Sequence, residues 1–219
     1  MTVVLLEPPM HRAFELAWES FCAGSLGIGA VITRDDEMVT TGRNRLAEHD
    51  AGDDLLAGTS LAHAEINALA KLRWGAQADG LQLWTTLQPC LQCLGAIRLS
   101  AVTEVHVLAP DPLFRGVEGA RHLNEFIGSR WPEFVQHDIN EWAVLSLLFQ
   151  THVTTFWKVT VPGWNEALPS IATLAADLVA SGQLLELADA QVDVVDVAEA
   201  LWPRLGGCVA DVALVAADG

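Results

Sequence analysis

The N-terminal part of the chain switches between helical and strand-like hydrophobic patterns. In residues 9–21 apolar side chains recur every three to four positions, which predicts an amphipathic helix. The apolar run at residues 28–33 predicts a buried strand, and residues 38–41 follow a polar turn as its hairpin partner. Residues 47–60 are rich in Asp, Gly and Ala, and a loop of about fourteen residues is long for a compact domain. Such loops are often lids or binding loops, and we expect that role here.

The same alternation continues through the middle of the chain. We predict helices over residues 61–74, 119–128 and 141–156, a further helix opened by Pro89 at its first position, and strands over residues 81–86, 105–108 and 132–135. Strands that alternate with helices are typical of an α/β layered sheet rather than of an all-α or all-β fold.

A change of composition at Pro162 and Gly163 predicts a boundary. Beyond it the chain is rich in Ala, Leu, Val and Asp, and residues 168–180 and 192–205 have helical patterns. We therefore divide the chain into residues 1–161 and a helical C-terminal extension, residues 162–219. The apolar faces of these helices must be buried, and we expect them to pack against the first region or against a sister subunit.

Composition and charge narrow the possible partners. Of the 219 residues, 51% are hydrophobic and 18% are charged, which argues against a disordered chain. Lys and Arg number 12 against 28 Asp and Glu, so the formal net charge is −16. Arg43 with Arg45 is the closest approach to a basic patch, so we expect neither nucleic acid nor an anionic membrane as a partner. No apolar run approaches the roughly 20 residues of a spanning helix. Four cysteines in so apolar a chain do not make a disulfide framework, and we expect a reducing, cytoplasmic location.

Cysteines 90 and 93 form the first of two segments that carry chemistry. Cys90 and Cys93 follow Pro89 and are three residues apart, so on a helix they share one face. A helix N-terminus favours their thiolate forms, which are the forms that bind zinc. The pair supplies two zinc ligands and one His would make a third, which leaves the fourth tetrahedral position open for water. A redox pair is the alternative interpretation of these two cysteines.

The second segment places His63 and Glu65 on either side of Ala64. Positions i and i+2 of an ideal helix point in different directions, so both side chains can address one site only at an open first turn. The arrangement suits a ligand at His63 and a carboxylate at Glu65 that moves protons from a water of lowered pKa to a ring nitrogen and a leaving amine. A packed core histidine is the alternative for His63 taken alone. The combination of H-x-E with a later P-C-x-x-C is the signature of zinc-dependent nucleobase deaminases.

Over residues 10–158 the sequence resembles the cytidine/deoxycytidylate deaminase superfamily, in the branch with guanine deaminase, yeast-type cytosine deaminase and bacterial tRNA adenosine deaminase. The segments that carry the resemblance are the two zinc segments, residues 61–69 and 84–97, together with residues 27–32, 42–45 and 109–111. The resemblance implies a three-layer α/β/α sandwich around a five-stranded mixed sheet, and a dimer. Gln88 departs from relatives that often carry Glu just before the Pro-Cys pair.

The resemblance also implies roles for the site residues. His63, Cys90 and Cys93 would bind Zn²⁺, and Glu65 would be the proton shuttle. The candidate substrate contacts are Asn44, Ala64, Asp111 and Phe114. A turn residue is the alternative for Asn44, and a strand end is the alternative for Asp111. Phe114 either stacks on a base or packs in the core.

Three functions follow from these patterns. The first is a zinc-dependent hydrolytic deaminase of a free nucleobase, a nucleoside or a related small amino-heterocycle, acting as a homodimer and releasing ammonia. The second is a tRNA adenosine deaminase, which the net charge of −16 disfavours. The third is a non-catalytic, deaminase-like binding module with structural zinc. Against it stand the carboxylate of Glu65 and the count of three ligands, because a closed structural site needs four.

Overall fold

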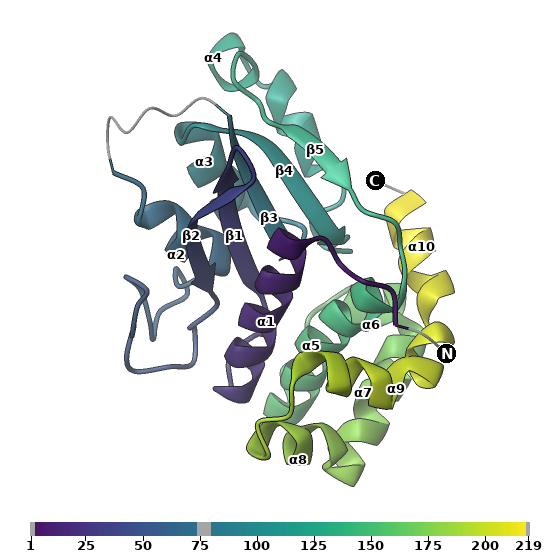
Figure 1. Ribbon diagram of the computed structural model, residues 1–219. Coiled ribbons are helices and arrows are strands. Elements are labelled where there is room, and N and C mark those ends of the chain that lie inside the picture. The colour runs from purple at the N-terminus through teal and green to yellow at the C-terminus, as the bar shows by residue number, and fades with distance from the viewer. Residues whose placement is uncertain (1–2, 74–79, 218–219) are drawn as a thin grey trace.

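A five-stranded mixed sheet forms the centre of the computed structural model, which describes residues 3–73 and 80–217 (Figure 1). Its strands are β1 (Gly29–Arg34), β2 (Glu37–Arg43), β3 (Leu81–Leu87), β4 (Val102–Ala109) and β5 (Glu133–Gln136), in the order β2-β1-β3-β4-β5. β1 pairs antiparallel with β2 and β3, whereas β4 runs parallel to both β3 and β5. The predicted α/β class and the mixed five-stranded sheet are confirmed.

Helices cover both faces of the sheet. α1 (Pro8–Cys22) and α5 (Glu141–Trp157) lie on one face, and α2 (Ala64–Ala70) and α3 (Leu91–Leu99) lie on the other (Figure 1). Two glycines allow this close packing. A Cβ at Gly29 would lie 2.0 Å from the Ala13 carbonyl oxygen in α1, and one at Gly42 would lie 2.4 Å from the Ala64 carbonyl oxygen in α2. The backbone of β2 therefore approaches the first turn of α2, where the H-x-E segment lies.

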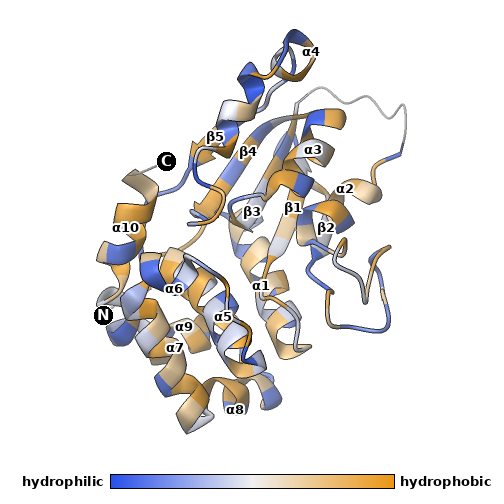
Figure 2. Cartoon of the chain, turned by 180° about the vertical axis from the view of Figure 1, so that it is seen from behind, coloured by the Kyte–Doolittle hydropathy of each residue, from blue (hydrophilic) through white to orange (hydrophobic). Residues whose placement is uncertain are grey.

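The C-terminal helices enlarge the same core. They are α6 (Trp164–Ala167), α7 (Pro169–Ser181), α8 (Gln183–Asp189), α9 (Val194–Gly206) and α10 (Val209–Ala217). α7, α9 and α10 pack against α5, which is consequently buried on all sides from residue 142 to residue 153. Figure 2 shows hydrophobic stretches on these helices, and their buried side chains join those of the sheet in one cluster. The helices predicted at residues 168–180 and 192–205 are confirmed, and the domain boundary at residue 162 stays a prediction.

Three predicted helices differ from the structure. The helix expected over residues 61–74 spans only Ala64–Ala70, because His63 is extended, and Trp74 lies outside the described residues. The helix expected to open at Pro89 begins at Leu91, after an extended Cys90. The helix expected over residues 119–128 is instead a 3₁₀ helix, η1 (Val117–His122), followed by α4 (Glu125–Gly128). The Asn124 side chain accepts a hydrogen bond from the Ile127 N–H and so starts a new helix within that segment.

An ion-pair network fastens the loop at residues 47–60. Arg43 Nη1 lies 2.5 Å from Glu48 Oε1, and Arg45 Nε lies 2.7 Å from Asp54 Oδ2. Lys71 Nζ lies 2.8 Å from Asp54 Oδ1. The Asp54 side chain is only 4% exposed, so these charges attract one another with little screening by water. Arg43 and Arg45, the pair that comes closest to a basic patch in the sequence, are therefore both engaged in ion pairs with this loop.

Within the described residues no single helix is long and apolar enough to cross a membrane. Two bent helix pairs, α7 with α8 and α9 with α10, pass that test together on length and composition alone.

Candidate active site

The two segments that carry chemistry meet at the starts of two neighbouring helices. His63 immediately precedes α2 with φ −77° and ψ 153°, and Cys90 immediately precedes α3 with φ −71° and ψ 172°. Because His63 is extended and Glu65 is helical, the two side chains escape the divergence of an i, i+2 pair on a regular helix. α2 and α3 contact each other beneath the sheet, so both helix starts face one site.

Three potential metal ligands form a compact triangle. His63 Nδ1 lies 3.5 Å from Cys90 Sγ and 3.4 Å from Cys93 Sγ, and the two sulfur atoms are 3.7 Å apart. Around a tetrahedral zinc with bonds of about 2.3 Å to sulfur and about 2.05 Å to nitrogen, the nitrogen–sulfur separations should be about 3.6 Å and the sulfur–sulfur separation about 3.8 Å. The donor set and its spacing therefore fit zinc, with room for one further ligand. In the described part of the chain, this is the group of His, Cys and acidic side chains that could hold a metal ion.

Hydrogen bonds among the three candidate ligand side chains shift their pKa values. The side-chain hydrogen bond between Cys90 and Cys93 lowers the pKa of Cys90 to about 4, and the hydrogen bond with His63 acts in the same direction. The same thiol–thiolate bond and burial raise the pKa of Cys93. The hydrogen bond to Cys90 raises the pKa of His63. Because metal ligands must be deprotonated, a cation that binds here releases protons and its affinity falls in acid.

Glu65 lies beside this triangle and is almost completely buried. Its side chain is 4% exposed, and its Oε2 accepts a hydrogen bond from Cys93 Sγ at 3.4 Å. Burial raises the pKa of the Glu65 carboxyl, although His63 acts against that shift. A carboxyl whose pKa is raised by burial holds a proton more readily, so it can both accept and donate one during a reaction.

A cavity of about 180 Å³ opens onto the triangle and Glu65. It is lined by Leu26, Ile28, His63, Glu65, Leu87, Gln88, Cys90, Asp111, Leu113, Phe114, Gln150, Thr154, Val161 and Trp164. Asp111 and Phe114, two of the predicted substrate contacts, are therefore in the wall. Burial raises the pKa of Asp111 to about 6. None of residues 47–60 lines the cavity, so the loop expected to be a lid or binding loop does not form its wall.

Asn44 and Ala64 are not among the residues that line this cavity. Both are fully buried. Asn44 Oδ1 accepts a hydrogen bond from the Leu46 N–H, whereas Asn44 Nδ2 has no hydrogen-bond partner among the described residues. Their proposed contacts with substrate stay predictions.

Sequence reasoning missed the part of the wall that comes from α5 and from the residues after it. Gln150 and Thr154 belong to α5, and Val161 and Trp164 follow it. A signal existed for Gln150, a polar residue in a mostly apolar helix, although it did not set Gln150 apart from Ser146, Thr151 and His152 nearby. For Trp164 no local signal existed, because only the packing of the C-terminal helices on α5 brings it to the site.

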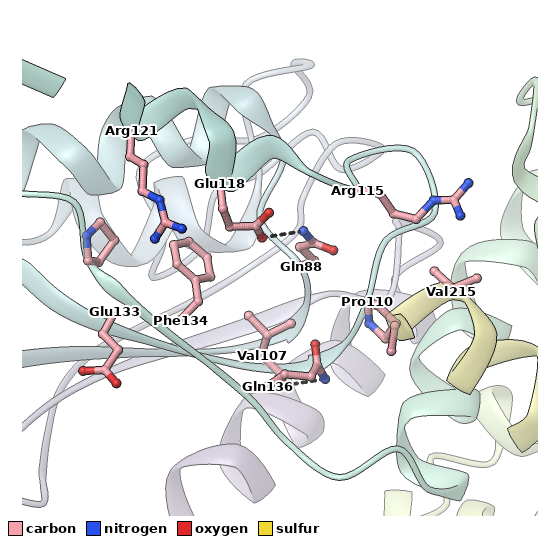
Figure 3. Close-up of a pocket in the computed structure, with 12 residues that line it drawn as sticks. Gln88, Val107, Pro110, Arg115, Glu118, Arg121, Glu133, Phe134, Gln136 and Val215 are labelled. Atoms are coloured by element: carbon pink, nitrogen blue, oxygen red, sulfur yellow. Dashed lines mark hydrogen bonds between the residues drawn. The ribbon is translucent and has the colours of Figure 1, made fainter. Parts of the chain in front are cut away.

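Gln88 separates this cavity from a second one of about 450 Å³. Its Nε2 donates to Glu118 Oε1 at 2.9 Å and to the Phe114 carbonyl at 3.2 Å, and its Oε1 accepts from the Asp111 N–H at 3.0 Å. Figure 3 shows this side chain beside Glu118 in the second cavity, whose lining also includes Val215 of α10. Gln88 therefore holds the segment that carries Asp111 and Phe114 against the end of β3.

Comparison with known proteins places the chain in a family. Residues 5–109 match the family model for the cytidine and deoxycytidylate deaminase zinc-binding region. Over this region the chain belongs to the cytidine/deoxycytidylate deaminase superfamily.

The individual relatives act on different substrates. Guanine deaminase of Bacillus subtilis (strain 168) is 35% identical over 92 residues, which cover 40% of this chain and 54% of that protein. tRNA-specific adenosine deaminase 2 of Xenopus tropicalis is 28% identical over 99 residues, which cover 41% of this chain and 54% of that protein. The chain thus spans about half the length of the curated relatives that it matches.

The fold is also found among solved structures. A structure of NE0047 in complex with 2,6-diaminopurine is similar with a TM-score of 0.50 and 19% identity, covering 70% of this chain and 84% of that one. At this identity the likeness establishes the fold.

Proposed function

We propose that this chain is a zinc-dependent hydrolytic deaminase of a small amino-heterocycle, namely a free nucleobase or a nucleoside. One observation carries the proposal: a triangle of zinc-type donors and one buried carboxyl meet at the wall of a single small cavity. His63 Nδ1, Cys90 Sγ and Cys93 Sγ would hold the zinc ion. When bound, zinc supplies a water molecule whose pKa is lowered towards about 7.

Glu65 is the proton carrier in this proposal. It takes one proton from the attacking water and gives it to a ring nitrogen. It then takes the second proton of that water from the oxygen now bonded to the ring carbon and gives it to the departing amine. A C–O bond forms at the amine-bearing ring carbon, the C–N bond breaks, and ammonia leaves. The raised pKa of Glu65 supports this role, because a buried carboxyl holds a proton between the two transfers more readily than an exposed one.

The walls of the cavity suit one flat heterocycle. Leu26, Ile28 and Leu87 provide apolar surface, and Phe114 offers an aromatic face for stacking. The volume of about 180 Å³ is below the roughly 300–1,000 Å³ of pockets that hold drug-sized ligands. Asp111, with its pKa raised to about 6, offers either a donor or an acceptor to the ring.

A tRNA substrate is the second candidate, because relatives with the name tRNA-specific adenosine deaminase match the chain. The charge distribution argues against it. The formal net charge is −16, and the guanidinium groups of Arg43 and Arg45 are engaged with Glu48 and Asp54. Affinity for a phosphate backbone comes from basic side chains that are free to neutralise phosphates, because this releases the counterions condensed on the nucleic acid.

The proposal is tested by ammonia release from free bases, nucleosides, nucleotides and a tRNA anticodon stem-loop, with zinc measured on the same protein sample. We expect turnover of at least one free base or nucleoside and none of the stem-loop. Turnover of the stem-loop alone would replace the proposal with the tRNA candidate. Full zinc occupancy without ammonia from any of these compounds would favour the binding-module alternative.

Two further expectations belong to this proposal. The first is a homodimer, which light scattering of the purified protein would measure. The second is a cytoplasmic location, which fractionation of cells that express the chain would establish.

A further inference from the structure

The side-chain donors in the cavity wall are already used inside the protein. Gln88 Nε2 donates to Glu118 Oε1 and the Phe114 carbonyl. Thr154 Oγ1 donates to the Gln150 carbonyl at 3.0 Å, and Trp164 Nε1 donates to Thr151 Oγ1 at 2.9 Å. A ligand in the cavity therefore meets side chains whose fixed N–H and O–H groups are committed elsewhere.

Gln150 is held in one orientation by its amide nitrogen. Gln150 Nε2 donates to the Gly27 carbonyl at 2.8 Å and to the Ser146 carbonyl at 3.2 Å. The first bond requires the backbone at Gly27 to lie close to α5. Only a glycine fits there, because a Cβ at Gly27 would lie 2.7 Å from the Phe149 Cβ. Since both acceptors are carbonyls, the nitrogen must be the atom that faces them, and the position of the oxygen follows.

The oxygen of the same amide has no partner. Gln150 is 4% exposed and lines the cavity, and its Oε1 is buried without a hydrogen-bond partner among the described residues. Buried polar atoms in native proteins are nearly always paired, and those that are not call for an explanation. A ligand N–H would supply the missing donor.

We propose that Gln150 is a specificity-determining residue whose Oε1 accepts a hydrogen bond from an N–H group of the substrate, and that the substrate is therefore a donor-rich amino-heterocycle. This inference rests on the proposed deaminase function. Glu65 and Asp111, the two carboxyls in the wall, add further acceptor capacity. Heterocycles with a second amino group or a second ring N–H match such a wall better than adenine, which has one amino group, one ring N–H and three ring acceptors.

The experiment uses pairs of ligands that differ by one donor. The probes are 2,6-diaminopurine with adenine, guanine with 9-methylguanine, and cytosine with 1-methylcytosine. Binding to the full-length, zinc-loaded protein is measured by calorimetry, and ammonia release is measured where it occurs. In the wild type we expect at least one donor deletion to weaken binding by about 10- to 100-fold. Equal binding within each of the three pairs would overturn the inference without any variant.

Two variants separate recognition from a merely structural role. Gln150→Leu removes the acceptor, and we expect the preference within the discriminating pair to fall below about threefold. Gln150→Glu keeps an acceptor, and in its neutral form can still donate to the Gly27 carbonyl, so we expect it to retain most of the preference. A structural role would weaken both members of each pair equally in Gln150→Leu, and an unchanged preference in that variant would overturn the inference.

The outcome also distinguishes this inference from the proposed function. Ammonia release without discrimination between the members of any pair would leave the deaminase proposal in place and refute the role of Gln150. Donor-dependent binding without ammonia release from any probe would support the role of Gln150 and count against the deaminase proposal.

Discussion

Replacement of Glu65 by Gln separates its chemical role from its structural one. The amide has nearly the shape of the carboxyl and can keep the contact that Glu65 Oε2 makes with Cys93 Sγ at 3.4 Å. It cannot carry a proton. Since general acid–base catalysis contributes about 10²- to 10⁴-fold, we expect kcat to fall by that factor, which corresponds to about 3–5 kcal/mol of activation free energy.

The Glu65→Gln variant should lose activity without losing stability. Burial raises the pKa of Glu65 in the folded state, so the ionised carboxyl opposes folding at neutral pH. The favourable contribution of the protonated form is complete below the unfolded-state pKa and is lost as the pH rises through the folded-state pKa. With zinc chelated, Glu65→Gln should therefore be at least as stable as the wild type at pH 7, and the difference should shrink towards pH 4.

The assay pairs ammonia release with zinc content and urea unfolding on each variant. Glu104→Gln is a matched control, because Glu104 lies near the opposite end of β4 from Asp111 and an amide can replace its hydrogen bonds. We expect that control to stay within about threefold of the wild-type kcat, because Glu104 is not among the residues that line the cavity. A kcat for Glu65→Gln within tenfold of the wild type, at equal zinc content, would refute the proton-carrier role.

Four further substitutions test the fold and its charges. Asp54→Ala removes the carboxylate that Arg45 and Lys71 share and leaves Arg45 paired only with Glu48, and urea unfolding should show a loss of about 3 kcal/mol. Gly29→Ala puts a Cβ against a carbonyl of α1 and should cost about 3 kcal/mol or more. Gly95→Ala puts a Cβ at an exposed position of α3, where it meets nothing within 4 Å, and should gain about 0.5–1 kcal/mol. Asp111→Asn should stabilise the zinc-free protein at pH 7 by up to about 3 kcal/mol, because the folded-state pKa of about 6 lies above the usual value near 3.9. That gain should vanish as the pH falls from 6 to 4, and a constant gain over this range would contradict the raised pKa of Asp111.

The order and type of the elements around the site could be read from the sequence because hydrophobic periods are local. The run at residues 28–33 and the helical spacing at residues 9–21 became β1 and α1 with small shifts of their ends. The ends of α2 and α3 could not be read in this way. His63 and Cys90 are extended because the site needs their side chains at the helix starts, and a hydrophobic pattern does not encode that requirement.

Some residues of the candidate site could be identified from the sequence and others could not. His63, Glu65, Cys90 and Cys93 were identifiable because the spacing of their residue types expresses the chemistry directly. Asp111 and Phe114 were the part of the cavity wall that the sequence identified, whereas Gln150 and Trp164 reach the wall through the packing of α5 and the C-terminal helices, at long sequence separation. The loop at residues 47–60 misled in the opposite sense: its length suggested a lid, but its acidic residues anchor it in ion pairs.

The most direct test of the central claim follows zinc and turnover through one cycle of chelation and reconstitution. The base or nucleoside that releases ammonia fastest serves as substrate, and zinc per chain is measured by elemental analysis at each stage. We predict that activity disappears with the metal and returns in proportion to zinc, up to one ion per chain, and that Cys93→Ser restores neither. Turnover that persists after the zinc is removed, or one bound zinc per chain with no ammonia from any base or nucleoside, would contradict the account.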